Sequence, residues 1–356
     1  MDLDSIEFTK HFNKTNNDAL DKILKESNVC LICKRQVSSF CHSHSIPLNI
    51  LKKMNLKDGK IIPFQNALME KRLTHIEKGK KNSSIFRNIC QECDQLFFSK
   101  IDNMNVIEDE WTNEILRLQA IRILLYKIHR TKEFTYSFYE FSKKGLSTEQ
   151  ILNGQKMDLE DIKYYCKQLE NTLSEEKKEY KILFSKTLDY EINFACVNLM
   201  KIMVNPFLDT IIVTGDNEEM RIETDDIEGK YYTTIKMDKN RNSNQNVYFI
   251  ALPGNGKTKI ILYSDTESIA GMLLDICFND MEESEIMNYL SVTLVIFGNN
   301  MYGNEKFVKK IRQNCYIFNE LNFMKNGNTA IANLTTEDLK IVYSNLANEK
   351  FNLFME

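Results

Sequence analysis

The chain has 356 residues, of which 43% are hydrophobic and 27% are charged, and its formal net charge is −4. This is the composition of an ordinary folded protein, and the length predicts two or three domains. The first thirty residues are polar and acidic, without the apolar core of a secretory signal, and no run of about eighteen apolar residues could span a membrane. We therefore expect no membrane segment, and the cysteine usage, which suits a reducing compartment, predicts a cytoplasmic protein.

Short helices are expected over residues 5–27, and two cysteine pairs with CxxC spacing follow. CLIC contains Cys30 and Cys33, and ICQEC contains Cys90 and Cys93. Each CxxC turn can direct two thiolates at one tetrahedral ion, so two turns supply the four ligands of a structural Zn²⁺ site. A redox-active CxxC, which needs only one pair, and a disulfide framework are the alternatives. The presence of two pairs and the absence of a secretory signal favour zinc.

Two histidines lie between the cysteine pairs, in the stretch FCHSHSIP over residues 40–47. The chain has five histidines, and His42 and His44 are two of them. A lone histidine is more often a surface or core residue than a ligand or a base. Residues two apart in a strand share a face, so these side chains could act together.

The cysteine-rich segment is locally basic. Residues 30–100 carry 13 Lys and Arg against 5 Asp and Glu, a net charge of +8, whereas the remaining residues have a net charge of −12. Such a segment can neutralise phosphates of a nucleic acid, and a solvated loop is the alternative. The acidic remainder of the chain favours phosphate contact. The basic residues are Lys52, Lys53, Lys57, Lys60, Lys78, Lys80, Lys81 and Arg87.

Helical spacing dominates the middle of the chain. The pattern predicts one long helix over residues 107–144 and a further amphipathic helix over residues 158–203, broken if anywhere near Ser174. Asn205 and Pro206 end this pattern. We therefore expect a helical region over residues 105–204.

Beyond residue 205 the pattern changes to short apolar runs separated by Asp, Asn and Gly. TIIVTG, YYTTIKM, VYFIAL and KIILYS are predicted strands, and helices are expected over residues 266–278, 282–297 and 335–346. The fold class predicted is α+β. Its three parts are a zinc-binding domain over residues 1–104, the helical region over residues 105–204, and an α/β or α+β domain over residues 205–356.

The stretch ALPGNGKT, residues 251–258, satisfies the pattern of a nucleotide-binding phosphate loop. A phosphate loop opens a helix, whereas KIILYS after this stretch predicts a strand. Gly254, Asn255 and Gly256 suit a tight hairpin turn, because residues in such a turn must tolerate positive φ. We therefore expect a hairpin and no nucleotide site over residues 251–258.

The order of elements around the cysteines is a CxxC turn, the extended run QVSSFCHSHSIP, a long loop, the extended run SSIFRNIC, a second CxxC and the helical run DQLFFSKID. Over roughly residues 28–102 this order resembles the HNH-like (ββα-metal) endonuclease family in its four-cysteine, treble-clef form. The matching stretches are SHSIP, which places His44 at the family's general base, and CQECD, which places Asp94 where the family often has Asn or His. The chain departs from the pattern at Ser43, where the family commonly has an acidic metal ligand.

The resemblance implies a metal-dependent endonuclease that acts on a nucleic acid, with DNA favoured. His44 would take a proton from the attacking water, and Mg²⁺ or Mn²⁺ would stabilise charge on the phosphate. Asp94 would hold this ion, and His42 is a second candidate ligand, with a surface role as its alternative. Modules of this kind are common in bacterial defence and mobile-element proteins, so the resemblance suggests such a role.

The alternative function is a non-catalytic zinc module that binds a nucleic acid or a protein partner. Ser43 is the residue that favours this alternative. The helical and C-terminal regions could bind that protein partner or form a homo-oligomer. The sequence does not distinguish DNA from RNA or assign a role to residues 205–356.

Overall fold

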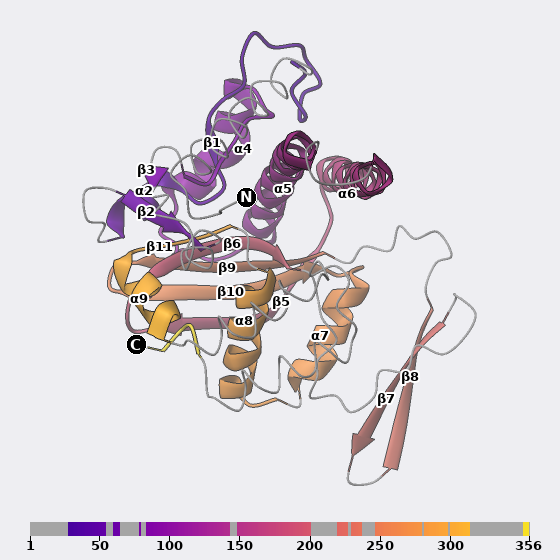
Figure 1. Ribbon diagram of the computed structural model, residues 1–356. Coiled ribbons are helices and arrows are strands. Elements are labelled where there is room, and N and C mark those ends of the chain that lie inside the picture. Colours follow the sequence, from indigo (N-terminus) through magenta and orange to yellow (C-terminus); the bar gives the residue numbers. More distant parts are fainter. Residues whose placement is uncertain are drawn as a thin grey trace.

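A seven-stranded antiparallel sheet forms the centre of the protein in a computed structural model, and helices lie on both of its faces (Figure 1). The structure describes residues 28–54, 60–64, 78–79, 83–142, 148–200, 219–226, 229–236, 246–279, 281–297, 300–313 and 352–355. The mixture of helix and sheet confirms the predicted α+β class. The strand order is β3-β2-β11-β6-β9-β10-β5. The strands are β2 (Lys60–Pro63), β3 (Lys78–Gly79), β5 (Tyr180–Leu188), β6 (Phe194–Met200), β9 (Val247–Gly254), β10 (Lys257–Asp265) and β11 (Met301–Gly303).

The central strands of the sheet are buried on both faces. Every residue of β6 and of β9 is buried. Successive side chains of a strand point to opposite faces, so each strand contributes to two cores. On β9, Phe249 belongs to one core and its neighbours Tyr248 and Ile250 belong to the other.

One face of the sheet is covered by the C-terminal helices. These are α7 (Ile269–Asn279), α8 (Glu283–Phe297) and α9 (Glu305–Gln313). Their buried residues form a core with Phe249, and Leu353 and Phe354 near the end of the chain complete it. The structure thereby confirms the helices predicted over residues 266–278 and 282–297.

The opposite face is covered by helices from the N-terminal half. They are α2 (Leu48–Lys53), α4 (Gln91–Asn103), α5 (Asn113–Ser142) and α6 (Thr148–Ser174). Leu124 and Leu125 of α5 are fully buried in the core beneath these helices, and Tyr248 supplies part of its floor. The same core contains Cys30 and Cys90, so the cysteine-rich segment packs on the helical layer and is continuous with the rest of the protein.

The prediction of a helix over residues 158–203 is correct only as far as Ser174. The chain then forms β5 and β6, which pair with β10 and β9. A strand buried on both faces, such as β6, is a continuous apolar run, and its spacing does not distinguish it from a buried helix. The region over residues 105–204 is therefore helical only in part, and the sheet takes strands from all three predicted parts of the chain.

The predicted hairpin over residues 251–258 is confirmed. β9 pairs with β10, and the turn between them contains Asn255 at φ 54° and Gly256 at φ 76°. Positive φ at both central residues is the requirement of a type I′ turn, which matches the twist of the flanking strands. Thr258 and the residues after it lie in β10, so the loop does not open a helix.

A second hairpin, β7 (Glu219–Asp226) with β8 (Gly229–Lys236), confirms the strand predicted for YYTTIKM. The predicted elements TIIVTG, residues 5–27 and residues 335–346 lie outside the described residues. Among the described helices, none is both long enough and apolar enough to cross a membrane.

Candidate metal centre and catalytic residues

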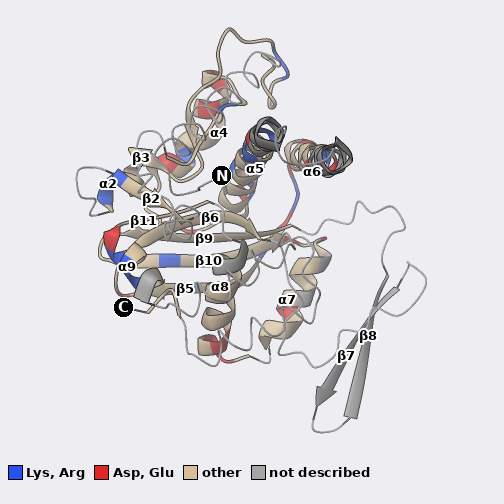
Figure 2. Cartoon of the chain, in the orientation of Figure 1, with Lys and Arg blue, Asp and Glu red and all other residues tan. Residues whose placement is uncertain are grey.

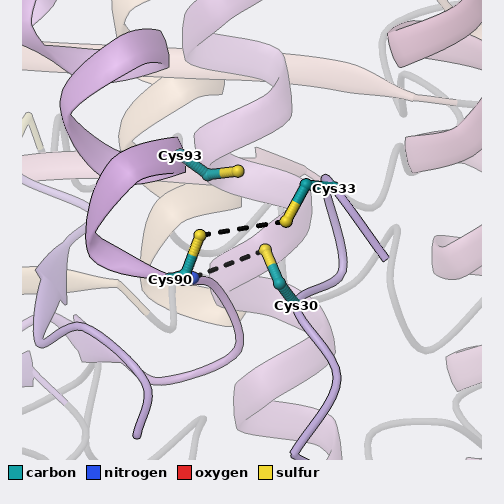
Figure 3. Close-up of side chains that lie close together, drawn as sticks. All are labelled: Cys30, Cys33, Cys90 and Cys93. Atoms are coloured by element: carbon teal, nitrogen blue, oxygen red, sulfur yellow. Dashed lines mark hydrogen bonds between the residues drawn. The ribbon is translucent and has the colours of Figure 1, made fainter. Parts of the chain in front are cut away.

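The two CxxC turns bring their four sulfur atoms together. The sulfurs of Cys30, Cys33, Cys90 and Cys93 all lie within 4.8 Å of one another, and those of Cys33 and Cys90 are 3.9 Å apart (Figure 3). Sulfurs bound to one tetrahedral zinc at about 2.3 Å are separated by about 3.8 Å. A disulfide bond needs a separation of about 2.05 Å. The cluster could therefore hold one metal ion such as Zn²⁺, and its geometry is not that of a disulfide.

Local backbone structure explains how the turns form. The amide of Cys30 donates to the carbonyl oxygen of Arg35 at 2.9 Å, and the amide of Lys34 donates to that of Cys30 at 2.9 Å. Lys34 closes this first turn with φ of 57°. Cys90 is the N-cap of α4 and Cys93 lies in its first turn. The second pair thus projects from the start of a helix toward the first.

Hydrogen bonds and burial set the charge of the thiols. The guanidinium of Arg35 donates to the Cys33 sulfur at 3.4 Å and lowers the pKa of that thiol to about 6. The backbone amide of Cys90 donates to the Cys30 sulfur at 3.4 Å. Burial raises the pKa of Cys30 and Cys93. Because thiolates are the ligands, metal binding releases protons from these two thiols, and affinity falls as the pH falls.

A short antiparallel strand pair and a helix adjoin the cysteine cluster. β1 (Ser43–His44) pairs with β4 (Ile85–Phe86), so that Ser43 faces Phe86 and His44 faces Ile85. Phe86 packs edge-on against Phe98 of α4 with ring centroids 6.4 Å apart. This is the strand, strand and helix order that the sequence predicts around the metal centre.

The predicted catalytic residues lie on two elements. His44 is half-buried and is the last residue of β1. Asp94 lies in the first turn of α4, where its carboxylate accepts a hydrogen bond of 3.6 Å from the Cys41 thiol. Phe86 contacts Phe98 of α4, so the side of the β1–β4 pair that carries Phe86 faces α4. Ser43 is paired with Phe86 and lies on that side. Strand alternation places His44 on the opposite side.

His42 and Arg87 lie near each other. The side chain of His42 is exposed overall. Partial burial of its ring is the larger cause of its lowered pKa, and the positive charge of Arg87 is the smaller one. Arg87 itself is half-buried. A lowered pKa keeps His42 neutral at physiological pH, which is the form that binds a metal ion.

The structure describes part of the predicted basic surface. Lys52 and Lys53 are exposed in the last turn of α2 (Figure 2), and the Lys53 ammonium lies 3.4 Å from the Asn255 side-chain oxygen. Only the backbone of Lys78 is described, in β3, whereas Lys80 and Lys81 lie outside the described residues. Other charges of the segment are already paired within the protein: the ion pairs are Lys34–Glu170, Arg35–Glu92 and Lys100–Glu114.

Two buried residues near this site have no signal in the sequence. His129 of α5 is 4% exposed, its Nδ1 accepts the backbone amide of Arg87 at 3.5 Å, and burial lowers its pKa to about 4. Asn300, just before β11, hydrogen-bonds Ser45. His129 is a single histidine on an apolar helix face and matches no motif. Asn300 matches none either, because its partner Ser45 is 255 residues away. Arg35, two residues after Cys33, could have been identified from its position near the first CxxC.

Comparison of the chain with protein-family models, with curated proteins and with solved structures found no match. The functional assignment therefore depends on the geometry of the site and on the chemistry of its residues.

Proposed function

We propose that residues 28–103 form a zinc-stabilised endonuclease module of the HNH-like kind, which hydrolyses phosphodiester bonds with the help of Mg²⁺ or Mn²⁺. The observation that carries the proposal is the pairing of β1 with β4, followed directly by α4, around a cluster of four cysteines. His44 is the last residue of β1, and Asp94 lies in the first turn of α4.

In the proposed reaction, the imidazole of His44 accepts a proton from a water molecule as the water oxygen attacks phosphorus. The bond from phosphorus to the leaving oxygen then breaks, and that oxygen takes up a proton from solvent. A divalent ion, when bound, supplies Lewis-acid stabilisation of the charge on the phosphate and on the leaving oxygen. Asp94 is the proposed ligand for this ion, with His42 as a second candidate.

The structural ion has a different role. With all four ligand positions taken by Cys30, Cys33, Cys90 and Cys93, zinc has no open position for substrate. Its proposed role is to hold the first turn against α4 and thereby fix the strand that carries His44. Lys52 and Lys53 are free to approach a phosphate backbone, because their side chains are exposed on α2.

A second candidate function is that of a zinc module that binds nucleic acid or protein without cleaving it. Three observations favour it. Ser43, which replaces the acidic ligand common in the family, is 2% exposed. In addition, the Asp94 carboxylate already contacts Cys41, and β1 alternation directs His44 away from α4. In the endonuclease proposal His44 acts as a base and needs no bond to the ion that Asp94 would hold.

One assay separates the two functions. Purified protein is incubated with plasmid, single-stranded DNA and RNA, each with Mg²⁺, with Mn²⁺ and with EDTA. The endonuclease proposal expects cleavage with a divalent ion and none with EDTA. Asp94→Ala should lose cleavage and regain part of it at higher Mn²⁺, whereas Asp161→Ala, an exposed carboxylate on α6, should match the wild type. Salt-dependent binding without cleavage under any metal would establish the binding module.

A further inference from the structure

Asn300 joins the central sheet to the turn that follows His44. The residue is fully buried directly before β11. Its side-chain Nδ2 donates to the Val197 main-chain carbonyl at 2.5 Å, and the main-chain carbonyl of Asn300 accepts the Val197 amide at 3.2 Å. Asn300 is therefore fixed on β6 by both its main chain and its side chain.

The same side chain also contacts Ser45, the residue after His44. The Asn300 Nδ2 lies 2.8 Å from the Ser45 Oγ, and the Oδ1 lies 3.0 Å from it. An amide nitrogen has two hydrogens to donate. One is directed at Val197 and the other at Ser45, so the donor capacity of Asn300 is fully used.

Ser45 is held from its other side by Ser84, the residue directly before β4. Its backbone amide donates to the Ser84 carbonyl at 2.8 Å, and its hydroxyl lies 3.1 Å from the same oxygen. Ser84 is buried and adopts φ of 54°, a left-handed conformation that costs a non-glycine residue energy.

These contacts are strong constraints because no water reaches them. Ser45 and Asn300 are both 0% exposed. Removing one member leaves a buried polar group without its partner, which is unfavourable. Since Ser45 is bonded to His44, any shift of Ser45 moves the imidazole.

We propose that Asn300 is a positioning residue for His44: through Ser45 it fixes the end of β1 on the central sheet, so that the imidazole points at the reacting water. This inference rests on the proposed nuclease function. It also gives the C-terminal half of the chain a part in catalysis, since Asn300 lies 255 residues from Ser45. Asn300 does not touch the substrate in this proposal.

The test is a double-mutant cycle with Ser45→Ala, Asn300→Ala and the combined variant. Each single variant should lower kcat by about 10- to 100-fold, because small misplacements of a base have effects of this size. KM, nucleic-acid affinity and zinc content should stay as in the wild type. The combined variant should lose no more than either single variant, because both remove the same link.

The matched control is Asn198→Ala, the same change at a residue of β6 that is 2% exposed. Asn198 pairs with Phe249 across β6 and β9, and strand alternation places both on the sheet face covered by α8. Asn198→Ala should therefore lower stability without lowering kcat at a temperature where the protein stays folded. A kcat loss equal to that of Asn300→Ala would show that general destabilisation is the cause and would overturn the inference.

Histidine NMR gives a readout that does not depend on cleavage. The His44 ring signals, assigned by their absence in His44→Ala, should shift in Asn300→Ala and Ser45→Ala and stay in place in Asn198→Ala. Unchanged His44 signals, or additive kcat losses in the cycle, would contradict the positioning role. Absence of cleavage by the wild type would contradict the proposed function instead, and the ring signals would still decide whether Asn300 positions His44.

Discussion

The cysteine module and the central sheet are built in different ways. β1 and β4 of the module pair through two residues each, whereas β9 and β10 pair over eight. The sheet is stabilised by apolar side chains on both of its faces. The described strand pair of the module is short, and its four cysteines lie close enough together to hold a metal ion. Apolar burial therefore fixes the sheet, and we propose that a metal ion held by the four cysteines fixes the module.

The largest effect is expected from Cys90→Ser. The substitution removes one of four ligands, and binding of structural zinc contributes about 10–16 kcal/mol in zinc-finger peptides, of which we expect a loss of several kcal/mol here. Elemental analysis should show that zinc falls from about one per chain. Far-UV circular dichroism should show that most of the sheet remains, because its core does not depend on the ion.

The control for this change is Cys196→Ser. Cys196 is fully buried in β6 and is not part of the cysteine cluster. It lies in the core on the α8 side of the sheet. This variant should keep its zinc while losing some stability of the sheet. Full zinc retention in Cys90→Ser would refute the assignment of the metal site.

A smaller effect is expected at His129, which joins the module to α5. The unfolded chain takes up a proton on this histidine below about pH 6.5, whereas the folded protein does so only near pH 4. The unfolded state therefore binds more protons between these values, and stability falls as the pH falls through this window. Between pH 7 and pH 5 the loss from this group amounts to about 2 kcal/mol.

His129→Gln removes that titration. The variant should be less stable than the wild type at pH 7, because a side chain of another shape replaces the buried ring whose Nδ1 accepts the Arg87 amide. The free energy of unfolding, measured in urea, should fall in both proteins between pH 7 and pH 5. The fall should be about 2 kcal/mol smaller in His129→Gln than in the wild type. An equal fall in both proteins would show that His129 is not held neutral by burial.

The smallest effects are expected in the β9–β10 turn. Gly256→Ala should lower stability by about 1 kcal/mol, because alanine is strained at positive φ.

Lys257→Ala should change stability by less than about 0.5 kcal/mol, since its ion pair with Asp189 is exposed. Thermal unfolding measures both. Tight binding of ATP by the wild type, abolished in Lys257→Ala, would show that residues 251–258 bind nucleotide after all.

Much of this architecture could be predicted from the sequence. The CxxC spacing indicated the cluster of four cysteines, and the sequence PGNGKT followed by KIILYS indicated a hairpin, because both depend on local chemistry. The strands β5 and β6 were missed for a physical reason. Whether an apolar run becomes a helix or a strand there is decided by its neighbours β9 and β10, which lie far away in the sequence.

The same limit applies to the site. Short-range patterns located His44 and Asp94, yet they could not show that the Asp94 carboxylate contacts Cys41 or that Asn300 reaches Ser45. Such contacts arise only when the module packs on the sheet. Residues that position a catalytic group are therefore harder to find from one sequence than the group itself.

The central claim is that His44 acts as a general base, and the most direct test is cleavage by His44→Ala at matched zinc content. A general base contributes about 10²- to 10⁴-fold to rate, so cleavage should fall by that amount. Zinc content and nucleic-acid affinity should be retained, and His42→Ala should be affected less. Equal cleavage by the wild type and His44→Ala would contradict the account.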